Sequence, residues 1–238
     1  MPLPISTTPI YKIKLPVSEI ETEFRPFLVK EEKVLLIASE TKDPANVYTA
    51  IKNVVRECTF GKLNIDDICT ADMEYFFVNL RARSAGETAT PMIKCEKCET
   101  PVTLTVDLTR AKVNTKNYEG NNIMITDKIG VIMKFPNYEI LSKLKLSTDP
   151  SGITLEDNLN VVVACIDKIY DDQNVYDTKD YTTAEIREFL DSLTQGSFVK
   201  LIRFFETMPI LEMTEKYQCA KCGNSSSVTF RGMQDFFS

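Results

Sequence analysis

The N-terminal part of the chain alternates apolar and polar residues with a period of two. Between residues 9 and 27, apolar side chains alternate with lysines in one run and with glutamates in the next, and Pro16, Val17 and Ser18 separate the runs. This period is typical of a strand with one buried face. We expect an N-terminal β-hairpin in which lysines on one strand face glutamates on the other and help to set the register.

Helical spacing follows this hairpin. Leu28, Leu35 and Leu36 can share one face of a first helix, with Glu31 and Glu32 on the outside. We expect two further helices before the pattern changes again.

The second and third helices carry start and stop signals. Asp43 is a good N-cap, and Pro44 suits the first helical position. The third helix is expected to begin near Thr70 and to end at Gly86, which serves as its C-cap. The apolar positions of these two helices are Val47, Ile51, Val54, Val55, Cys58, Met73, Phe76, Phe77 and Leu80.

Short β-prone runs occupy the middle of the chain. We expect strands near 102–108, 121–126 and 130–135, followed at 146–154 by a loop that is the best candidate for a domain boundary. The next segment has apolar residues at helical spacing, which predicts one helix face made of Leu155, Leu159, Val162, Ile166 and Ile169.

Two more helices are predicted before the C-terminal segment. Thr182 and Glu185 have the spacing of a capping box, and Ser197 is the expected cap of the following helix, which Pro209 ends. A strand from Ile210 then leads toward the C-terminus. The expected inward side chains of the two helices are Ile186, Phe189, Leu190, Leu193, Phe198, Leu201, Ile202 and Phe205.

Two Cys-x-x-Cys pairs are the clearest chemical signal. Cys95 and Cys98 form one pair, Cys219 and Cys222 form the other, and each pair leads into a β-prone run. Thiolates at this spacing can bind one metal ion, and two such pairs that meet form a structural zinc site with four cysteine ligands. Because all four positions around the ion would be filled, such a site leaves none open for catalysis.

These patterns predict an α+β fold in four parts. Residues 1–90 form the β-hairpin with helices, and residues 91–145 form a β-rich region with the first knuckle. Residues 146–209 form a helical region. Residues 210–238 carry the second knuckle, which closes a zinc-ribbon-like region built from two distant halves.

Composition narrows the function classes. The formal net charge of -6 and a pI near 5.0 argue against a large nucleic-acid interface. The chain has no histidine, which removes Ser–His and Cys–His nucleophile activation. No apolar stretch is long enough to span a bilayer, and the N-terminus does not resemble a secretory signal, so we expect a reducing compartment. There, paired cysteines favour a metal over a disulfide.

Other interpretations of the knuckles stay open. A dithiol redox enzyme is one, but its motif needs a helix N-terminus after the pair, and both pairs here lead into strands. A zinc-ribbon nucleic-acid-binding or transcription-associated protein is another, because Lys and Arg residues flank the knuckles. The separation of about 120 residues between the pairs exceeds the usual spacing of a ribbon.

Two segments carry a family resemblance. Phe24–Lys33 reads FRPFLVKEEK, Leu80–Glu87 reads LRARSAGE, and the first Cys-x-x-Cys pair follows. In this order they resemble the baseplate hub assembly family of T4-like contractile-tailed bacteriophages. The resemblance implies a virus-encoded, non-enzymatic protein that is needed to build the central hub of the tail baseplate, as a hub subunit or as an assembly factor.

The resemblance also implies partners and a location. The partners would be other phage baseplate hub and tail proteins, with no membrane and no small-molecule substrate. The protein would act in the host cytoplasm during assembly and could remain in the baseplate of the virion tail.

The same two segments supply candidate partner-binding residues. Phe24, Arg25 and Phe27 form a corner after the hairpin, and Arg81 and Arg83 lie beside a helix end. Arginines in that position can bind the carboxylates or phosphates of a partner. The alternative is a solvated helix end, at which the arginines complement the helix dipole.

Overall fold

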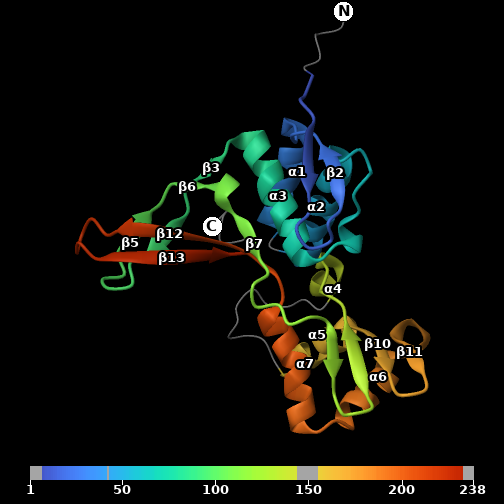
Figure 1. Ribbon diagram of the computed structural model, residues 1–238. Coiled ribbons are helices and arrows are strands. Elements are labelled where there is room, and N and C mark those ends of the chain that lie inside the picture. The colour runs from blue at the N-terminus through green and yellow to red at the C-terminus, as the bar shows by residue number, and fades with distance from the viewer. Residues whose placement is uncertain (1–6, 42, 144–154, 233–238) are drawn as a thin grey trace, which may run out of the picture. The chain divides into compact units, whose positions relative to one another are not determined.

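The computed structural model describes residues 7–41, 43–143 and 155–232, and it shows a mixed α+β chain (Figure 1). This part of the chain contains seven α-helices and several small antiparallel sheets. The chain divides into two units. Unit 1 comprises Met1–Asn114 and Ile210–Ser238, and unit 2 comprises Thr115–Pro209. In sequence, unit 2 is therefore an insertion into unit 1.

Unit 1 contains three helices and short strands from both ends of the chain. Its helices are α1 (Val29–Glu40), α2 (Pro44–Cys58) and α3 (Thr70–Ala85). Its strands are β1 (Tyr11–Lys14), β2 (Glu21–Phe24), β3 (Thr88–Ala89), β4 (Met92–Lys94), β5 (Pro101–Thr103), β6 (Val106–Asp107), β7 (Lys112–Asn114), β12 (Ile210–Gln218) and β13 (Ser225–Arg231).

Strands β1 and β2 pair in an antiparallel sheet, and their turn is fixed to α3. In the register, Lys12 lies opposite Glu23, and their charged groups are 3.8 Å apart. Asp72, in the first turn of α3, is fully buried and accepts hydrogen bonds from the backbone N–H groups of Val17 (2.9 Å) and Ser18 (2.7 Å). The Asp72 carboxylate thus provides acceptors for two backbone N–H groups of the turn.

Helices α2 and α3 begin where the sequence predicts, and α3 also ends at the predicted residue. The Asp43 side chain accepts a hydrogen bond from the N–H of Ala45 (3.1 Å), and Pro44 occupies the first turn. Helix α3 ends before Gly86, whose φ of 113° lies in the region that favours glycine. Their predicted apolar faces are buried at Ile51, Val54, Val55, Cys58, Met73, Phe76, Phe77 and Leu80.

Helix α1 differs from the prediction at its first turn. Glu31, expected outside, is only 4% exposed, whereas Leu36, expected inside, is 58% exposed. The Glu31 carboxylate accepts hydrogen bonds from the N–H of Leu28 (2.7 Å) and from the guanidinium group of Arg25 (3.0 Å). The polar residue lies inside because the start of a helix has unpaired N–H groups, and because the half-buried Arg25 needs an anionic partner.

A three-stranded sheet with the order β13-β12-β7 connects the two sequence segments of unit 1. Strand β12 pairs with β13 along its length, and Asn114 of β7 lies directly opposite Ile210 of β12. The Asn114 side chain also donates a hydrogen bond to Glu212 (2.8 Å). The chain therefore leaves unit 1 and returns to it at two residues that face each other across a strand pair.

Unit 2 has its own sheet, helices and core. Its four-stranded antiparallel sheet has the order β11-β10-β9-β8. The elements are β8 (Asn122–Met124), β9 (Gly130–Met133), α4 (Tyr138–Lys143), α5 (Leu155–Cys165), β10 (Ile166–Tyr170), β11 (Val175–Asp177), α6 (Thr183–Asp191) and α7 (Gln195–Thr207). Its most deeply buried side chains include Val131, Met133, Val162, Cys165, Ile166, Leu201 and Phe204.

One predicted helix of unit 2 is too long. The apolar spacing placed Ile166 and Ile169 on the same helix as Val162, but α5 ends at Cys165 and both isoleucines belong to strand β10. The spacing of three and four residues fits a helix, yet β10 is paired on both sides, with β9 and with β11. These long-range backbone hydrogen bonds outweigh the local pattern, and β-branched residues suit a strand.

The caps of α6 and α7 show one correct and one wrong prediction. Thr182 and Glu185 form the predicted capping box, because the N–H of Thr182 donates to Glu185 (2.7 Å) and the N–H of Glu185 donates to Thr182 (3.3 Å). The cap of α7 is Thr194, which accepts from the N–H of Ser197 (3.2 Å). Ser197 itself is buried within the first turn.

The expected boundary loop at 146–154 lies outside the residues that the structure describes. The strands near 121–135, which the sequence pattern grouped with the first knuckle, belong to unit 2.

We predict that unit 1 folds without unit 2. If residues 115–209 are replaced by Asn-Gly, β7 and β12 should form a hairpin, because Asn114 and Ile210 are already opposite each other and this turn suits two-residue connections. The shortened chain should melt cooperatively, as measured by circular dichroism. An equally long excision of residues 105–199 removes β6 and β7 and should abolish folding. A shortened chain as unfolded as this control would contradict the insertion arrangement.

We also predict that Glu31 is a major stabilising residue. Glu31→Ala leaves the 12%-exposed Arg25 side chain without its partner and should lower the free energy of unfolding by about 3 kcal/mol. Glu32→Ala, on the exposed side of α1, should change it by less than about 0.5 kcal/mol. Urea unfolding followed by circular dichroism measures both, and equal effects would refute the buried role.

The Glu31 contribution should depend on pH. Burial opposes ionisation, but the hydrogen bonds from Arg25 and from the N–H of Leu28 outweigh it and hold the pKa of Glu31 below its usual value. The stabilisation should be complete above the pKa of the unfolded chain, about 4.3, and should be lost as the pH falls through the lower folded-state value. The difference between the wild-type chain and Glu31→Ala should shrink accordingly.

Candidate metal centre

The two Cys-x-x-Cys knuckles have the same backbone hydrogen bonds. In the first, the N–H of Cys95 donates to Thr100 O (2.9 Å), and the N–H of Glu99 donates to Cys95 O (2.8 Å). In the second, the N–H of Cys219 donates to Asn224 O (2.8 Å), and the N–H of Gly223 donates to Cys219 O (2.9 Å).

The residue after the second cysteine has a left-handed backbone in both knuckles. Its φ is 55° at Glu99 and 69° at Gly223. Glycine adopts this conformation readily, whereas a residue with a Cβ adopts it at a cost of about 1 kcal/mol. The two knuckles therefore share an uncommon backbone conformation at the same place, as well as the same hydrogen bonds.

Each knuckle is the turn of an antiparallel hairpin. Strands β4 and β5 carry the first, and strands β12 and β13 carry the second. The two hairpins lie side by side in unit 1 (Figure 1) and share a small apolar cluster. The cluster is composed of Cys95, Tyr217 and Cys219, with Ile93, Cys98, Val102, Leu104, Cys222 and Val228 packed against them.

The structure brings all four predicted cysteines to one point. Cys95 Sγ lies 3.7 Å from Cys222 Sγ, and Cys98 Sγ lies 3.7 Å from Cys219 Sγ. All four sulfur atoms lie within 4.8 Å of one another. None of these four cysteines is oxidised to a disulfide. Each close contact joins one knuckle to the other, so a single ion at the centre would bind both hairpins.

The surroundings favour thiolates at part of the cluster. The N–H groups of Lys97 and Cys98 lower the pKa of Cys95, and the hydroxyl and N–H of Thr100 lower the pKa of Cys98 to about 6. At Cys222 the N–H of Asn224 also favours the thiolate, but burial and the neighbouring sulfurs outweigh it and raise the pKa to about 11. Thiolates this close repel each other, so a cation that binds here would displace the remaining protons.

The remaining cysteines lie outside this cluster. Cys58 and Cys165 are fully buried, and Cys69 is half-buried at the N-cap of α3. Burial raises the pKa of Cys58 and Cys69 to about 11 and that of Cys165 to about 12. These thiols are protonated at neutral pH and pack as small apolar groups.

The candidate partner-binding residues differ in how deeply they are buried. Phe24 is 2% exposed and contacts the Phe76 ring edge-on, with 5.4 Å between centroids. Arg25 donates its backbone N–H to Cys58 O and its guanidinium to Glu31. These two side chains therefore stabilise the interior of unit 1.

Phe27 and the two arginines lie nearer the surface. The N–H of Phe27 donates to Ser84 Oγ (2.9 Å) and so joins the two segments that carry the family resemblance. Arg81 donates to Gly86 O (3.0 Å), and the exposed Arg83 pairs with Glu87 (2.7 Å). The guanidinium group of Arg83 also lies over the Tyr11 ring of β1, 5.1 Å from its centroid, and the side chain is still 43% exposed.

The long separation of the knuckles has a structural explanation. Of the 120 residues between Cys98 and Cys219, 95 belong to unit 2, so only 25 belong to unit 1. That number is close to the spacing of about 15–20 residues that is usual between the pairs of a compact four-cysteine site.

A family model described as T4 bacteriophage base plate protein matches residues 8–238, and the chain therefore belongs to that family. The match includes both units and both knuckles. Comparisons with curated proteins and with solved structures give no match. In the segments that the structure describes, no helix is both long and apolar enough to span a membrane.

We predict that the cluster binds one metal ion per chain. Cys95→Ser or Cys222→Ser should lose the ion and lower the melting temperature by about 10 °C or more, since a structural metal contributes several kcal/mol and each kcal/mol shifts the midpoint by roughly 2–4 °C. Elemental analysis and circular dichroism measure the two effects. Cys69→Ser is the matched control and should keep both the metal content and the melting temperature, because serine is a good N-cap for α3. A full complement of metal in either cluster variant would contradict a shared site.

Proposed function

We propose that this member of the T4 bacteriophage base plate protein family is a non-enzymatic protein of the central baseplate hub, either as a hub subunit or as an assembly factor. The family match across residues 8–238 carries the proposal. Its partners are then other hub and tail proteins, and it acts in the host cytoplasm during assembly and in the virion tail.

The chemistry of the chain supports a role without catalysis. A metal held by four cysteines has no open coordination position for a substrate. The three other thiols are protonated by burial, and the chain has no histidine to activate them. The metal would therefore hold the fold together.

We propose zinc as the ion. A tetrahedral site with Zn–S bonds of about 2.3 Å has edges of about 3.8 Å between its sulfur atoms. The two shortest distances between the knuckles, 3.7 Å each, match that edge. Cysteine-only ligation with paired hairpins is the arrangement of a zinc ribbon, here assembled from two distant segments of the chain.

A surface near the C-terminal end of α3 is our candidate for contact with hub partners. Arg83 is exposed, Phe27 and Arg81 are half-buried, and α3 itself is fixed to the core. Arginines held on a rigid helix can bind carboxylates of a partner through paired hydrogen bonds.

We expect the hub function to show in a phage that lacks this chain. Such a phage should accumulate incomplete baseplates, and the wild-type chain supplied in trans should restore complete ones, as measured by sedimentation and electron microscopy. The variant Arg81→Glu/Arg83→Glu should restore at least about tenfold fewer complete baseplates than the wild-type chain. A reduction of this size is expected because the variant loses one pair of charge-assisted hydrogen bonds to the partner.

The matched control reverses two exposed charges elsewhere in unit 1. Lys33→Glu/Arg56→Glu changes the net charge equally and should restore complete baseplates. Normal baseplates without the chain would refute the hub function. Full rescue by the α3 variant, with unchanged metal content and melting temperature, would refute only the α3 surface.

A further inference from the structure

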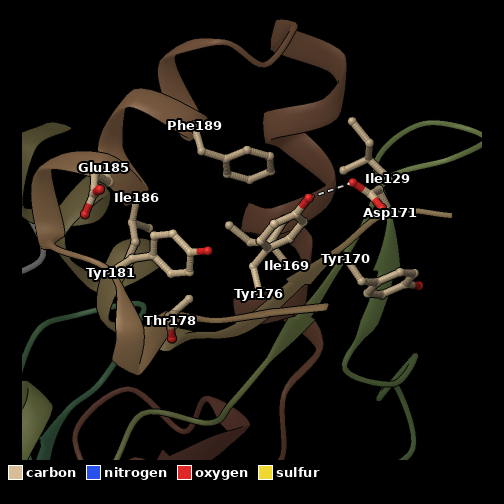
Figure 2. A pocket seen from close by; sticks show the side chains of 10 residues that line it. All are labelled: Ile129, Ile169, Tyr170, Asp171, Tyr176, Thr178, Tyr181, Glu185, Ile186 and Phe189. Carbon is tan, nitrogen blue, oxygen red and sulfur yellow. Dashed lines mark hydrogen bonds between the residues drawn. The ribbon is translucent and has the colours of Figure 1, made fainter. Parts of the chain in front are cut away.

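Unit 2 contains a cavity of about 340 Å³ beside strands β10 and β11 and helix α6 (Figure 2). Its walls include the rings of Tyr176, Tyr181 and Phe189 and three isoleucine side chains. Asp171 and Glu185 border the cavity as well, and Figure 2 shows their carboxylates on opposite sides of the three rings. A volume of this size is sufficient for a ligand or for a side chain of a partner.

The aromatic walls are held in place by specific contacts. The rings of Tyr176 and Tyr181 meet at 70°, with 6.2 Å between centroids. The Tyr176 hydroxyl donates a hydrogen bond to Asp171 (2.9 Å), which fixes the orientation of its ring. Figure 2 shows Phe189 facing the same space from α6, so that aromatic faces border the cavity from both the sheet and the helix.

Both carboxylates are held in the ionised form. Asp171 accepts hydrogen bonds from the N–H groups of Gln173 and Asn174 (2.8 Å each), and Glu185 accepts one from the N–H of Thr182 (2.7 Å). These bonds keep the pKa of both carboxyl groups below the usual range. At neutral pH the border of the cavity therefore carries negative charge.

No positive charge offsets them within the lining. None of the ten lining residues labelled in Figure 2 is a lysine or arginine. The surrounding segment 171–185 contains five acidic residues and one basic residue, Lys179. Anionic ligands such as phosphates are disfavoured here. A cation with an apolar stem satisfies both the aromatic faces and the carboxylates.

We propose that this cavity binds an arginine or lysine side chain of a partner protein. The aliphatic stem would lie against the isoleucines, and the cationic head would lie at the border of the cavity, near a ring and one of the two carboxylates. That the cation belongs to a protein rests on the proposed hub function, because baseplate subunits act by binding one another. The preference for a cation rests on the cavity alone.

The preference can be tested with the full-length chain and two small probes. N-acetyl-arginine methylamide and its citrulline analogue have nearly the same shape, but only the arginine probe is charged. In a titration followed by NMR, the arginine probe should shift the ring signals of Tyr176, Tyr181 and Phe189. Its affinity should be at least about tenfold higher than that of the citrulline probe. Equal affinities, or no response to the arginine probe, would overturn the proposal.

Two variants separate local charge from net charge. Asp171→Asn/Glu185→Gln removes both charges but keeps the hydrogen-bond acceptors, because a capping box allows glutamine in place of glutamate. This variant should lose the preference for the arginine probe over the citrulline probe. Glu188→Gln/Asp191→Asn makes the same change of charge at exposed positions of α6 outside the lining and should keep it. An equal effect of the two variants would refute a local site.

An assembly experiment tests whether the bound cation belongs to a partner protein or to a free cationic metabolite. Supplied to a phage that lacks the chain, the cavity variant Asp171→Asn/Glu185→Gln should restore fewer complete baseplates than the Glu188→Gln/Asp191→Asn control. Equal rescue would overturn the assignment to a partner protein. Failure of the hub function would appear differently, as normal baseplates without any copy of the chain, and the probe titration does not depend on it.

Discussion

Unit 1 brings two hairpins from distant parts of the chain together where four sulfur atoms lie within 4.8 Å of one another. These sulfur atoms come from the β4–β5 hairpin in the middle of the chain and from the β12–β13 hairpin near its C-terminus. Thiolates at this distance would repel one another, and a positive ion at the centre would remove that repulsion. Beside the cluster, buried residues of α3 pack against β12 and β13, so the same closure holds the helical part of unit 1.

The remaining constraints of unit 1 are polar groups buried with partners. Asp72 fixes the turn between β1 and β2, and Glu31 neutralises Arg25 and completes the start of α1. Asp72 accepts hydrogen bonds from the N–H groups of Val17 and Ser18, and Glu31 accepts them from Arg25 and Leu28. These bonds orient short segments that make few apolar contacts of their own. The two segments with the family resemblance meet here, through the hydrogen bond from Phe27 to Ser84, so their pattern reflects the interior of the unit as well as its surface.

Unit 2 is built on different principles. Its core is apolar, and its cavity is bordered by aromatic rings whose positions follow from a capped helix and a tight turn. The groups that shape this cavity, Asp171 and Glu185, also satisfy backbone N–H groups. The chain thus combines a unit that brings four cysteines together with an inserted unit that has an aromatic cavity. Both units lie within the residues that match the baseplate family model.

Features whose partners lie within a few residues could be predicted from the amino-acid sequence alone. The caps at Asp43, Thr182 and Gly86 are local, and the Cys-x-x-Cys spacing is set within one turn, so each could be read from a short window. Three other features could be recognised only in the folded chain, namely the burial of Glu31, the start of a strand at Ile166 and the cavity of unit 2. Each depends on a partner that is distant in sequence or on a neighbouring strand. The separation of the knuckles belongs to the same class, because nothing local marks residues 115–209 as an insertion.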